Sequence, residues 1–494
     1  MAAADSESEG SAGTPTYQLV GRVLGPALFL LMLFFENSQA AMELNAWRVA
    51  AIGLWMAVWW STEAIPVPVT AFLPLVLFEP LGVFSLREAA APYANPTIYL
   101  YLGGFMMALA IERWNLHRRI SLAILDRTGT NGRRLVGGFM FVSAALSMWM
   151  TNTSTTMMLL PIVISVVAVM RENVTGVDAG TMRNFNVVML LGIAYGASIG
   201  GLATLVGTPP NALLIAFMAD NYDMEISFAR WMAVGIPITF ALLPLAWLVL
   251  TRFVFPINLP ANAAVDEHLH ELKRELGPMS VAERRVAAVF GTVIFCWMFR
   301  RPLTGFLGIE GVSDAGIVMT AAVLLFLLPS SQPGQRQLLV WDDAARLPWG
   351  VLVLFGGGLS LASAVSDSGL ALWLGQSLAP LNAYGTAVLV VAAVALVIYL
   401  TELTSNLATT ATLLPVMAAI AVQAGVPPIV LTVPITIAAS CAFMLPVATP
   451  PNAIVFSTGE LSIPQMVRAG FFLNLVGIVL VSIVSIWVAP ELLQ

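Results

Sequence analysis

Long apolar segments separated by short polar ones make up most of the chain. Runs such as LGPALFLLMLFF, AAVLLFLLP and VLVVAAVALVIYL recur along nearly its whole length. A helix needs about 20 mostly apolar residues to cross a membrane, and the pattern predicts about 11 such spans. They lie near residues 18–36, 47–63, 66–83, 97–112, 184–203, 232–254, 286–300, 313–329, 347–366, 429–446 and 465–489. The pattern therefore predicts an all-α polytopic membrane protein.

Two further apolar stretches, 135–171 and 383–424, are too long for one span and are each interrupted by polar residues. The first contains MTNTSTTMM around Asn152, and the second contains LTSNLATTA around Asn406. Each stretch is either a pair of crossing helices or a re-entrant hairpin whose tip ends at mid-membrane. The apolar residues close to each tip favour the hairpin, because non-helical backbone at membrane depth is tolerated where it lines a protein cavity.

The composition supports a membrane protein and identifies two polar segments. Only 10% of the residues are charged and 59% are hydrophobic, whereas about a quarter of a soluble domain is charged. Residues 1–17 lack the features of a signal peptide and predict a disordered tail. Residues 257–285 predict an interfacial linker helix on the cytoplasmic surface. His268 and His270 lie in this linker, where a solvated helix face is favoured over a metal site.

The arginines predict the orientation. With a cytoplasmic amino terminus, an external carboxy terminus and hairpins that return to their side of entry, most basic residues fall inside, as the positive-inside rule requires. Only Arg48, Arg87, Arg230, Arg300 and Arg301 fall outside. A crossing helix pair would give the same sides, so charge does not distinguish it from a hairpin. We expect a multi-pass protein of the inner (plasma) membrane, with no basic stripe for nucleic acid.

The polar interruptions belong to an internal repeat. TNTSTTMMLLPI (151–162) matches SNLATTATLLPV (405–416), and VGTPPNALLIA (206–216) matches VATPPNAIVFS (447–457). Upstream, YLGGFMMALA (101–110) corresponds to LFGGGLSLAS (354–363). The first hairpin would enter from the cytoplasm and the second from outside, so the repeats are inverted. Inverted repeats with interrupted helices are typical of secondary transporters that bind their substrate at the midplane.

The Pro-Pro-Asn motifs predict breaks in two helices. Prolines lack amide donors, so a helix breaks before them and can restart after them. Each break frees upstream carbonyls, here those of Val206, Gly207, Val447 and Ala448. Such carbonyls suit a small cation such as Na⁺, and helix amino termini attract anions. The alternative is that these polar residues only join helices and the prolines only kink them, but the duplication of the whole set favours a site.

The same segments carry no basic side chain. Residues 147–162, 196–216, 403–416 and 441–457 contain no Lys, Arg or His. A charge near the bilayer centre costs about 3 kcal/mol even on lenient scales. A bound dianion would therefore need cations bound beside it, which predicts symport of Na⁺ with an anion rather than uniport.

On these segments the chain resembles the divalent anion/sodium symporter family, which transports di- and tricarboxylates and, in some members, sulfate. WWSTEAIPVPVTAFLPLVL, YLGGFMMALAIERWNLHRRI, both hairpin tips and both Thr-Pro-Pro-Asn motifs carry the resemblance. It implies an elevator-type homodimer that couples Na⁺ to C4-dicarboxylates such as succinate, malate or fumarate, or to citrate. The expected division is scaffold helices in 18–112, a first transport-domain half in 113–222, scaffold helices and the linker in 223–346, a second transport-domain half in 347–464 and a C-terminal helix in 465–494.

The resemblance also implies at least two Na⁺ sites and one anion site. One Na⁺ site would use Ser147, Thr151, Asn152 and the Gly207 backbone, and the other Thr401, Thr404, Asn406 and the Ala448 backbone. The anion would contact Asn152, Thr153, Thr208, Pro209, Asn406, Leu407, Thr449 and Pro450. Two positions depart from the family's Ser-Asn-Thr signature. Thr151 keeps the hydroxyl of the usual Ser, whereas Leu407 replaces a Thr and removes a donor from one end of the anion site.

Several alternatives remain. The family contains sodium-independent dicarboxylate exchangers and sodium/sulfate symporters. A basic residue near the cation pockets would favour an exchanger, and the motif segments contain none. A channel would not need duplicated broken helices around a closed site. An enzyme is not expected, because an intramembrane hydrolase needs a nucleophile with a base, and no His lies in a predicted span. Glu63 and Glu402 lie at span ends, where capping or bridging is favoured over proton transfer.

Overall fold

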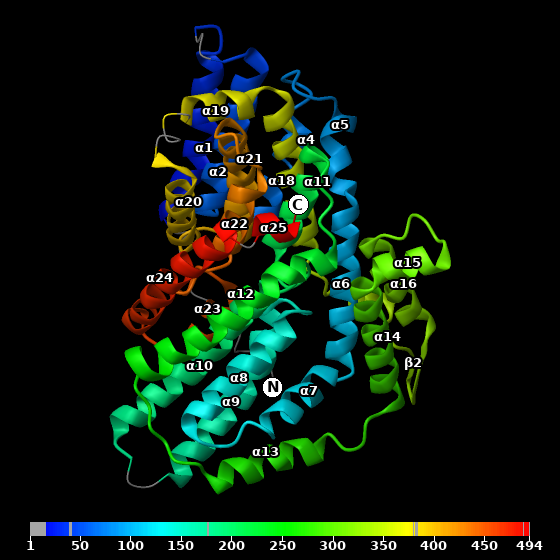
Figure 1. Cartoon of the computed structure of the whole chain (residues 1–494), viewed down its shortest axis with the longest axis vertical. Coiled ribbons are helices and arrows are strands. Elements are labelled where there is room, and N and C mark those ends of the chain that lie inside the picture. The colour runs from blue at the N-terminus through cyan, green and yellow to red at the C-terminus, as the bar shows by residue number, and fades with distance from the viewer. Residues whose placement is uncertain are drawn as a thin grey trace, which may run out of the picture.

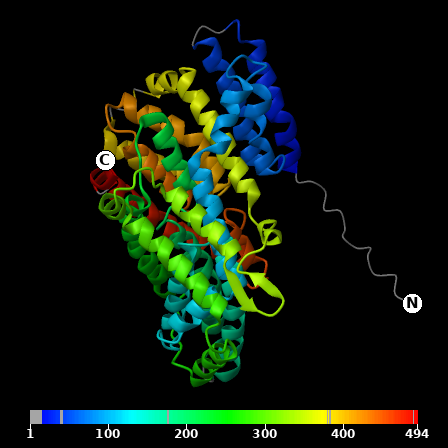
Figure 2. The ribbon, with the colours of Figure 1, turned by 90° about the vertical axis from the view of Figure 1, so that its right-hand side faces the viewer.

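The computed structural model describes residues 16–38, 42–174, 177–378, 380, 384–487 and 489–493. Residues 1–15 of the predicted tail lie outside this part. The described chain is almost entirely helical (Figure 1). The exception is one antiparallel pair, β1 (Pro329–Gln332) with β2 (Gln335–Gln337), which projects from the helical body in the turned view of Figure 2.

The helices follow the order that the internal repeat predicts. The first repeat contains α1 (Thr16–Phe34), α2 (Leu44–Thr62), α3 (Val67–Thr70), α4 (Leu73–Leu77), α5 (Leu86–Ala90), η1 (Ala91–Ala94), α6 (Pro96–Arg113), α7 (Leu116–Leu125), α8 (Gly132–Ser147), α9 (Asn152–Asn173), α10 (Ala179–Gly201) and α11 (Pro209–Tyr222). The central part contains α12 (Phe228–Leu248), η2 (Val249–Val254), α13 (Ala263–Glu275), α14 (Val281–Met298), α15 (Arg300–Leu307), α16 (Asp314–Leu327) and α17 (Trp341–Ala344). The second repeat contains α18 (Trp349–Asp367), α19 (Leu370–Leu378), α20 (Thr386–Thr401), α21 (Asn406–Gln423), α22 (Ile429–Ala439), α23 (Pro450–Phe456), α24 (Ile463–Trp487) and α25 (Ala489–Leu493).

The structure confirms the all-α membrane class. Within the described residues, 8 helices are long and apolar enough to cross a membrane, and 9 if the α14–α15 pair, bent by 81°, counts as one span. Several predicted spans are shorter or broken. The span near 66–83 is divided into α3 and α4. Each of these helices has a proline in its first turn, and a proline cannot continue a preceding helix because it lacks an amide donor. The span near 429–446 ends as a helix at Ala439.

The linker predicted over 257–285 contains the amphipathic helix α13, which runs along α7 and α9 (Figure 1). Its two histidines have separate partners: His268 Nε2 lies 3.1 Å from Ser165 Oγ, and His270 Nε2 lies 3.1 Å from Asp126 Oδ1. Lys273 Nζ donates to Asp126 Oδ2 at 2.5 Å, and this hydrogen bond lowers the pKa of the Asp126 carboxyl against the opposing effect of burial.

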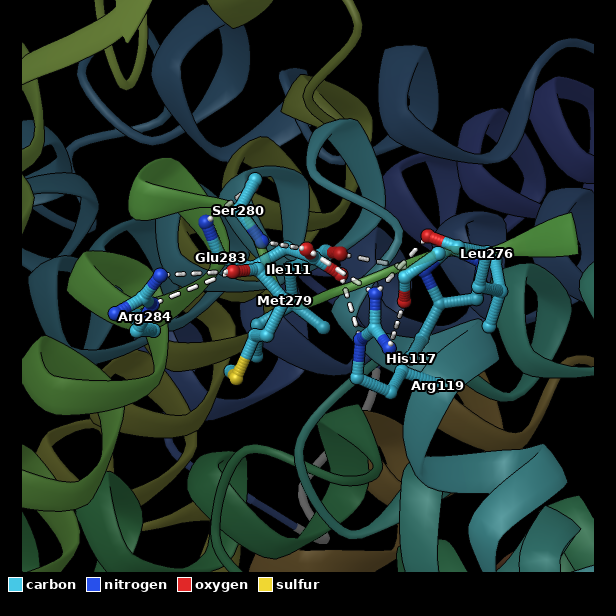
Figure 3. Close-up of polar contacts among 9 residues, drawn as sticks. Ile111, His117, Arg119, Leu276, Met279, Ser280, Glu283 and Arg284 are labelled. Atoms are coloured by element: carbon cyan, nitrogen blue, oxygen red, sulfur yellow. Dashed lines mark hydrogen bonds and ion pairs between the residues drawn. The ribbon is translucent and has the colours of Figure 1, made fainter. Parts of the chain in front are cut away.

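Arg119 of α7 forms hydrogen bonds with the segment that joins α13 to α14 and with the first turn of α14 (Figure 3). Its guanidinium donates to both oxygens of Glu283, at 2.9 and 3.3 Å, and to the carbonyls of Leu276 and Gly277. Glu283 also completes a capping box with Ser280 at the start of α14. One arginine thus holds the linker against the first repeat.

Candidate functional site

The first hairpin tip is the turn between α8 and α9. Thr151 caps α9, because its hydroxyl accepts from Ser154 N at 3.1 Å. Asn152 is the first residue of α9, and its Oδ1 accepts from the buried Ser147 hydroxyl at 2.5 Å. The amide nitrogen of Asn152 has no partner among the described residues, so the tip retains a free donor.

The break between α10 and α11 packs against this tip. The Asn211 side chain is fully buried and donates to the carbonyls of Gly201 (3.2 Å), Leu202 (3.4 Å) and Thr204 (2.7 Å). The Thr204 hydroxyl in turn donates to the Met148 carbonyl at the tip and accepts from Gly207 N at 3.1 Å. The Asn of the Pro-Pro-Asn motif therefore satisfies carbonyls that the broken helix leaves free.

Close backbone contact brings several oxygen atoms together in the first repeat. A Cβ on Gly207 would lie 2.5 Å from the Gly201 oxygen and 2.9 Å from the Ser147 oxygen. A Cβ on Gly201 would lie 2.7 Å from Asn152 Oδ1 and 3.0 Å from the Gly207 oxygen. Only glycines permit this approach. Carbonyl and amide oxygens gathered in this way suit a Na⁺ ion.

The second repeat reproduces the hydrogen bonds of the tip and the break, although Ala442 and Ala448 stand at the positions of Gly201 and Gly207. Thr401 donates to Asn406 Oδ1 at 2.9 Å, as Ser147 does to Asn152. Asn452 donates to the carbonyls of Ala442 (3.3 Å) and Leu445 (3.0 Å), the counterparts of Gly201 and Thr204. The caps of the two restarted helices, Thr208 and Thr449, share nearly the same extended backbone, with φ −142° in both.

The tie between tip and break differs between the repeats. In the second repeat, the buried Glu402 carboxylate accepts from the backbone nitrogens of residues 443–445 at 2.7–3.1 Å and from Asn474 Nδ2 at 2.8 Å. These nitrogens are thereby withdrawn from a continuous helix, which explains why α22 ends early. Glu402 bridges neighbouring elements, as expected. Glu63 instead is exposed in a left-handed conformation (φ 46°) directly after α2.

Both tips and both breaks line one cavity of about 830 Å³. Of the predicted site residues, the cavity is lined by Thr151, Asn152, Thr153, Gly207, Thr208, Pro209, Asn406, Leu407, Ala448, Thr449 and Pro450. The structure does not bring Ser147, Thr401 or Thr404 to the cavity wall. Ser147 and Thr401 lie behind the asparagines that they contact, and Thr404 contacts Leu400 and Thr409.

Four helix amino termini contribute to the electrostatics of this cavity. The first residues of α9, α11, α21 and α23 all line it. Each helix start carries roughly half a positive charge, so four together correspond to roughly two. This potential favours a small dianion without a basic side chain at the tips.

Among the described residues, one basic side chain does line the cavity, and its exposure to solvent places it at the mouth. Arg346 lies just before α18 and donates to Glu112 Oε1, in the last turn of α6, at 2.6 Å. Motif segments alone gave no sign of it, because it lies outside them. The sequence also provided no role for Asn211, Asn452 or Gly201, although the repeated Asn after each Pro-Pro pair was a usable signal.

Comparison with known proteins identifies the family to which this chain belongs. A sequence model of the sodium:sulfate symporter transmembrane region matches residues 17–493. The chain belongs to this family. Relatives similar to it include the sodium-dependent dicarboxylate transporter SdcS of Staphylococcus saprophyticus, with 40% identity over 96% of this chain and 92% of the relative. SdcS of Staphylococcus aureus strain USA300 is also 40% identical, with the same coverage. The resemblance to divalent anion/sodium symporters is thereby confirmed.

Solved transporters share the fold at low sequence identity. The Alcanivorax borkumensis YdaH transporter aligns with a TM-score of 0.56 at 16% identity, covering 97% of this chain and 99% of that one. Neisseria gonorrhoeae MtrF aligns with a TM-score of 0.56 at 14% identity, covering 94% of each chain. The chain therefore shares the overall fold of these two proteins.

Proposed function

We propose that this chain is a secondary active symporter that couples Na⁺ to C4-dicarboxylates. The observation that carries the proposal is the convergence of two duplicated Asn tips and two broken helices on one cavity. The SdcS relatives, which are named sodium-dependent dicarboxylate transporters, support the same substrate class.

The tip asparagines provide the coupling in this proposal. The Oδ1 atoms of Asn152 and Asn406 each face a hydroxyl inside their repeat, where a Na⁺ ion would use the same oxygen. Their amide nitrogens have no partner among the described residues and could donate to a carboxylate of the substrate. A bound cation fixes the amide and neutralises the anion's charge at once, so the anion binds poorly when the cation sites are empty.

Sodium coupling is tested in proteoliposomes that contain the purified full-length chain. Uptake of labelled succinate is expected to rise at least tenfold with an inward Na⁺ gradient compared with K⁺, because a charge buried without its counter-ion costs about 3 kcal/mol. Equal uptake in the two salts would reject symport and support the sodium-independent exchanger. Sulfate added as a competitor distinguishes the sodium/sulfate symporter, which predicts strong inhibition.

Leu407 is the position to change for substrate preference. It lines the cavity at the second tip and carries no donor. Leu407→Thr is expected to lower the KM for succinate about tenfold, because one new hydrogen bond to a charged group contributes about 1.5 kcal/mol or more. Leu403→Thr, whose side chain is exposed and outside the cavity, is the control and should leave KM unchanged. Equal KM values for wild type and Leu407→Thr would mean that position 407 does not contact the substrate.

We also propose the larger assembly that the resemblance implies. The chain forms a homodimer, its amino terminus is cytoplasmic and its carboxy terminus external, and a transport domain moves against a scaffold in an elevator-type cycle. The bounds 113–222 and 347–464 for the transport-domain halves belong to this proposal. The placement of most basic residues on one side under this topology supports the orientation.

A further inference from the structure

The cavity mouth holds an ion pair that the proposed site does not use. Arg346 is the only Lys, Arg or His among the described residues that line the cavity. Its side chain is 58% exposed, whereas that of Glu112 is 27% exposed. One Nη2 contact with Glu112 is its single polar interaction among the described residues, so most of its five donors are free.

A second ion pair joins α6 to α17, three residues before Arg346, and does not line the cavity. Arg113, next to Glu112, donates to Asp343 and, at 3.2 Å, to Gln335 Oε1. Its side chain is 18% exposed and Asp343 is 19% exposed. The junction of α6 with α17 therefore already has a more buried tie, and the Arg346–Glu112 pair is not needed to hold it together.

We propose that Arg346 is an entry subsite for one carboxylate of a small organic dianion. The anion displaces Glu112 from the guanidinium at the mouth and then moves inward to the tip asparagines. This inference rests on the proposed function and names a second position for the same substrate. An exposed ion pair contributes little to stability, so exchanging one carboxylate partner for another costs little, and a guanidinium can bind the incoming carboxylate with two parallel hydrogen bonds.

Glu112 weakens anion binding at Arg346, because it is a competing carboxylate partner. While the mouth is empty it competes for Arg346, which limits how tightly an anion is held there. Glu63, the other acidic residue that lines the cavity, also opposes an anion. A carboxylate therefore pauses at Arg346 and is not trapped, as a transport pathway requires.

The test measures succinate uptake by the full-length chain in proteoliposomes at saturating Na⁺. Arg346→Gln is expected to raise KM about five- to tenfold with little change in Vmax, because a charged hydrogen-bond partner is lost from the approach. Glu112→Gln is expected to lower KM about two- to threefold, because the competitor is neutral. Arg346→Lys, which keeps the charge without the planar fork, should give an intermediate KM. Arg113→Gln is the matched control and should keep the wild-type KM.

Salt provides an independent readout. Raising KCl from about 20 to about 300 mM is expected to raise KM in the wild type and much less in Arg346→Gln, because screening removes the attraction of an exposed charge. A wild-type KM in Arg346→Gln, or an equal rise in Arg113→Gln, would overturn the subsite. Absence of succinate uptake by the wild type in the same vesicles would instead overturn the proposed function. Monodisperse elution of each variant excludes misfolding as the cause.

Discussion

Replacing either tip asparagine is expected to abolish transport. Asn152→Ala and Asn406→Ala each remove an oxygen proposed to bind Na⁺ and a nitrogen proposed to bind the anion. Each interaction with a charged group contributes about 1.5–3 kcal/mol, so losing two reduces the initial rate of succinate uptake by about a hundredfold or more. Uptake per mole of reconstituted protein is the measurement.

The matched control for these variants is Asn173→Ala. Asn173 ends the same helix that Asn152 begins, and within the described part of the chain its side chain donates only to the Val169 carbonyl, at 2.9 Å. It should transport at the wild-type rate. Near-normal uptake by Asn152→Ala or Asn406→Ala would remove that tip from the site, provided that both variants elute as the wild type does.

A single methyl group at Gly201 is expected to have an effect of similar size. In Gly201→Ala the new Cβ would lie 2.7 Å from Asn152 Oδ1 and 3.0 Å from the Gly207 oxygen, which fills the space proposed for the first Na⁺. The Na⁺ concentration for half-maximal uptake should rise at least fivefold, because overpacking at a rigid backbone site costs about 1–3 kcal/mol.

Gly291→Ala provides the comparison for this methyl group. Apart from the backbone of its own helix, no described atom lies within 4 Å of a Cβ at position 291 in α14, so that change should leave Na⁺ dependence unaltered and stabilise the helix slightly. An unchanged Na⁺ dependence in Gly201→Ala would show that no cation binds between Gly201, Gly207 and the first tip.

The duplicated motifs predicted the parts of the site that depend on local backbone chemistry. Pro209–Pro210 and Pro450–Pro451 had to interrupt a helix, and the polar tips had to find partners in an apolar surrounding. The contacts made over long sequence distances were not predictable in this way. Arg346 meets Glu112 across 234 positions, and only tertiary packing brings them together.

Apolar composition also concealed local structure. The segment 66–83 predicts one span by hydropathy, yet its prolines divide it into two short helices. The buried Glu402 could be interpreted as a capping group from the sequence, but its four donors became visible only once the break between α22 and α23 was placed against it. Hydropathy indicates which segments lie in the membrane, whereas the hydrogen-bond partners of the backbone determine where each helix ends.

The two different ties between tip and break have a common mechanical consequence. Consider a gate in which one hairpin moves away while the neighbouring broken helix stays in place. This motion would break the hydrogen bonds to Glu402 and leave an unpaired carboxylate in an apolar interior. In the other half the same motion would pull the Thr204 hydroxyl from the Met148 carbonyl. Substrate release by movement of one hairpin alone is therefore disfavoured. We expect each tip to move together with the broken helix to which it is hydrogen-bonded.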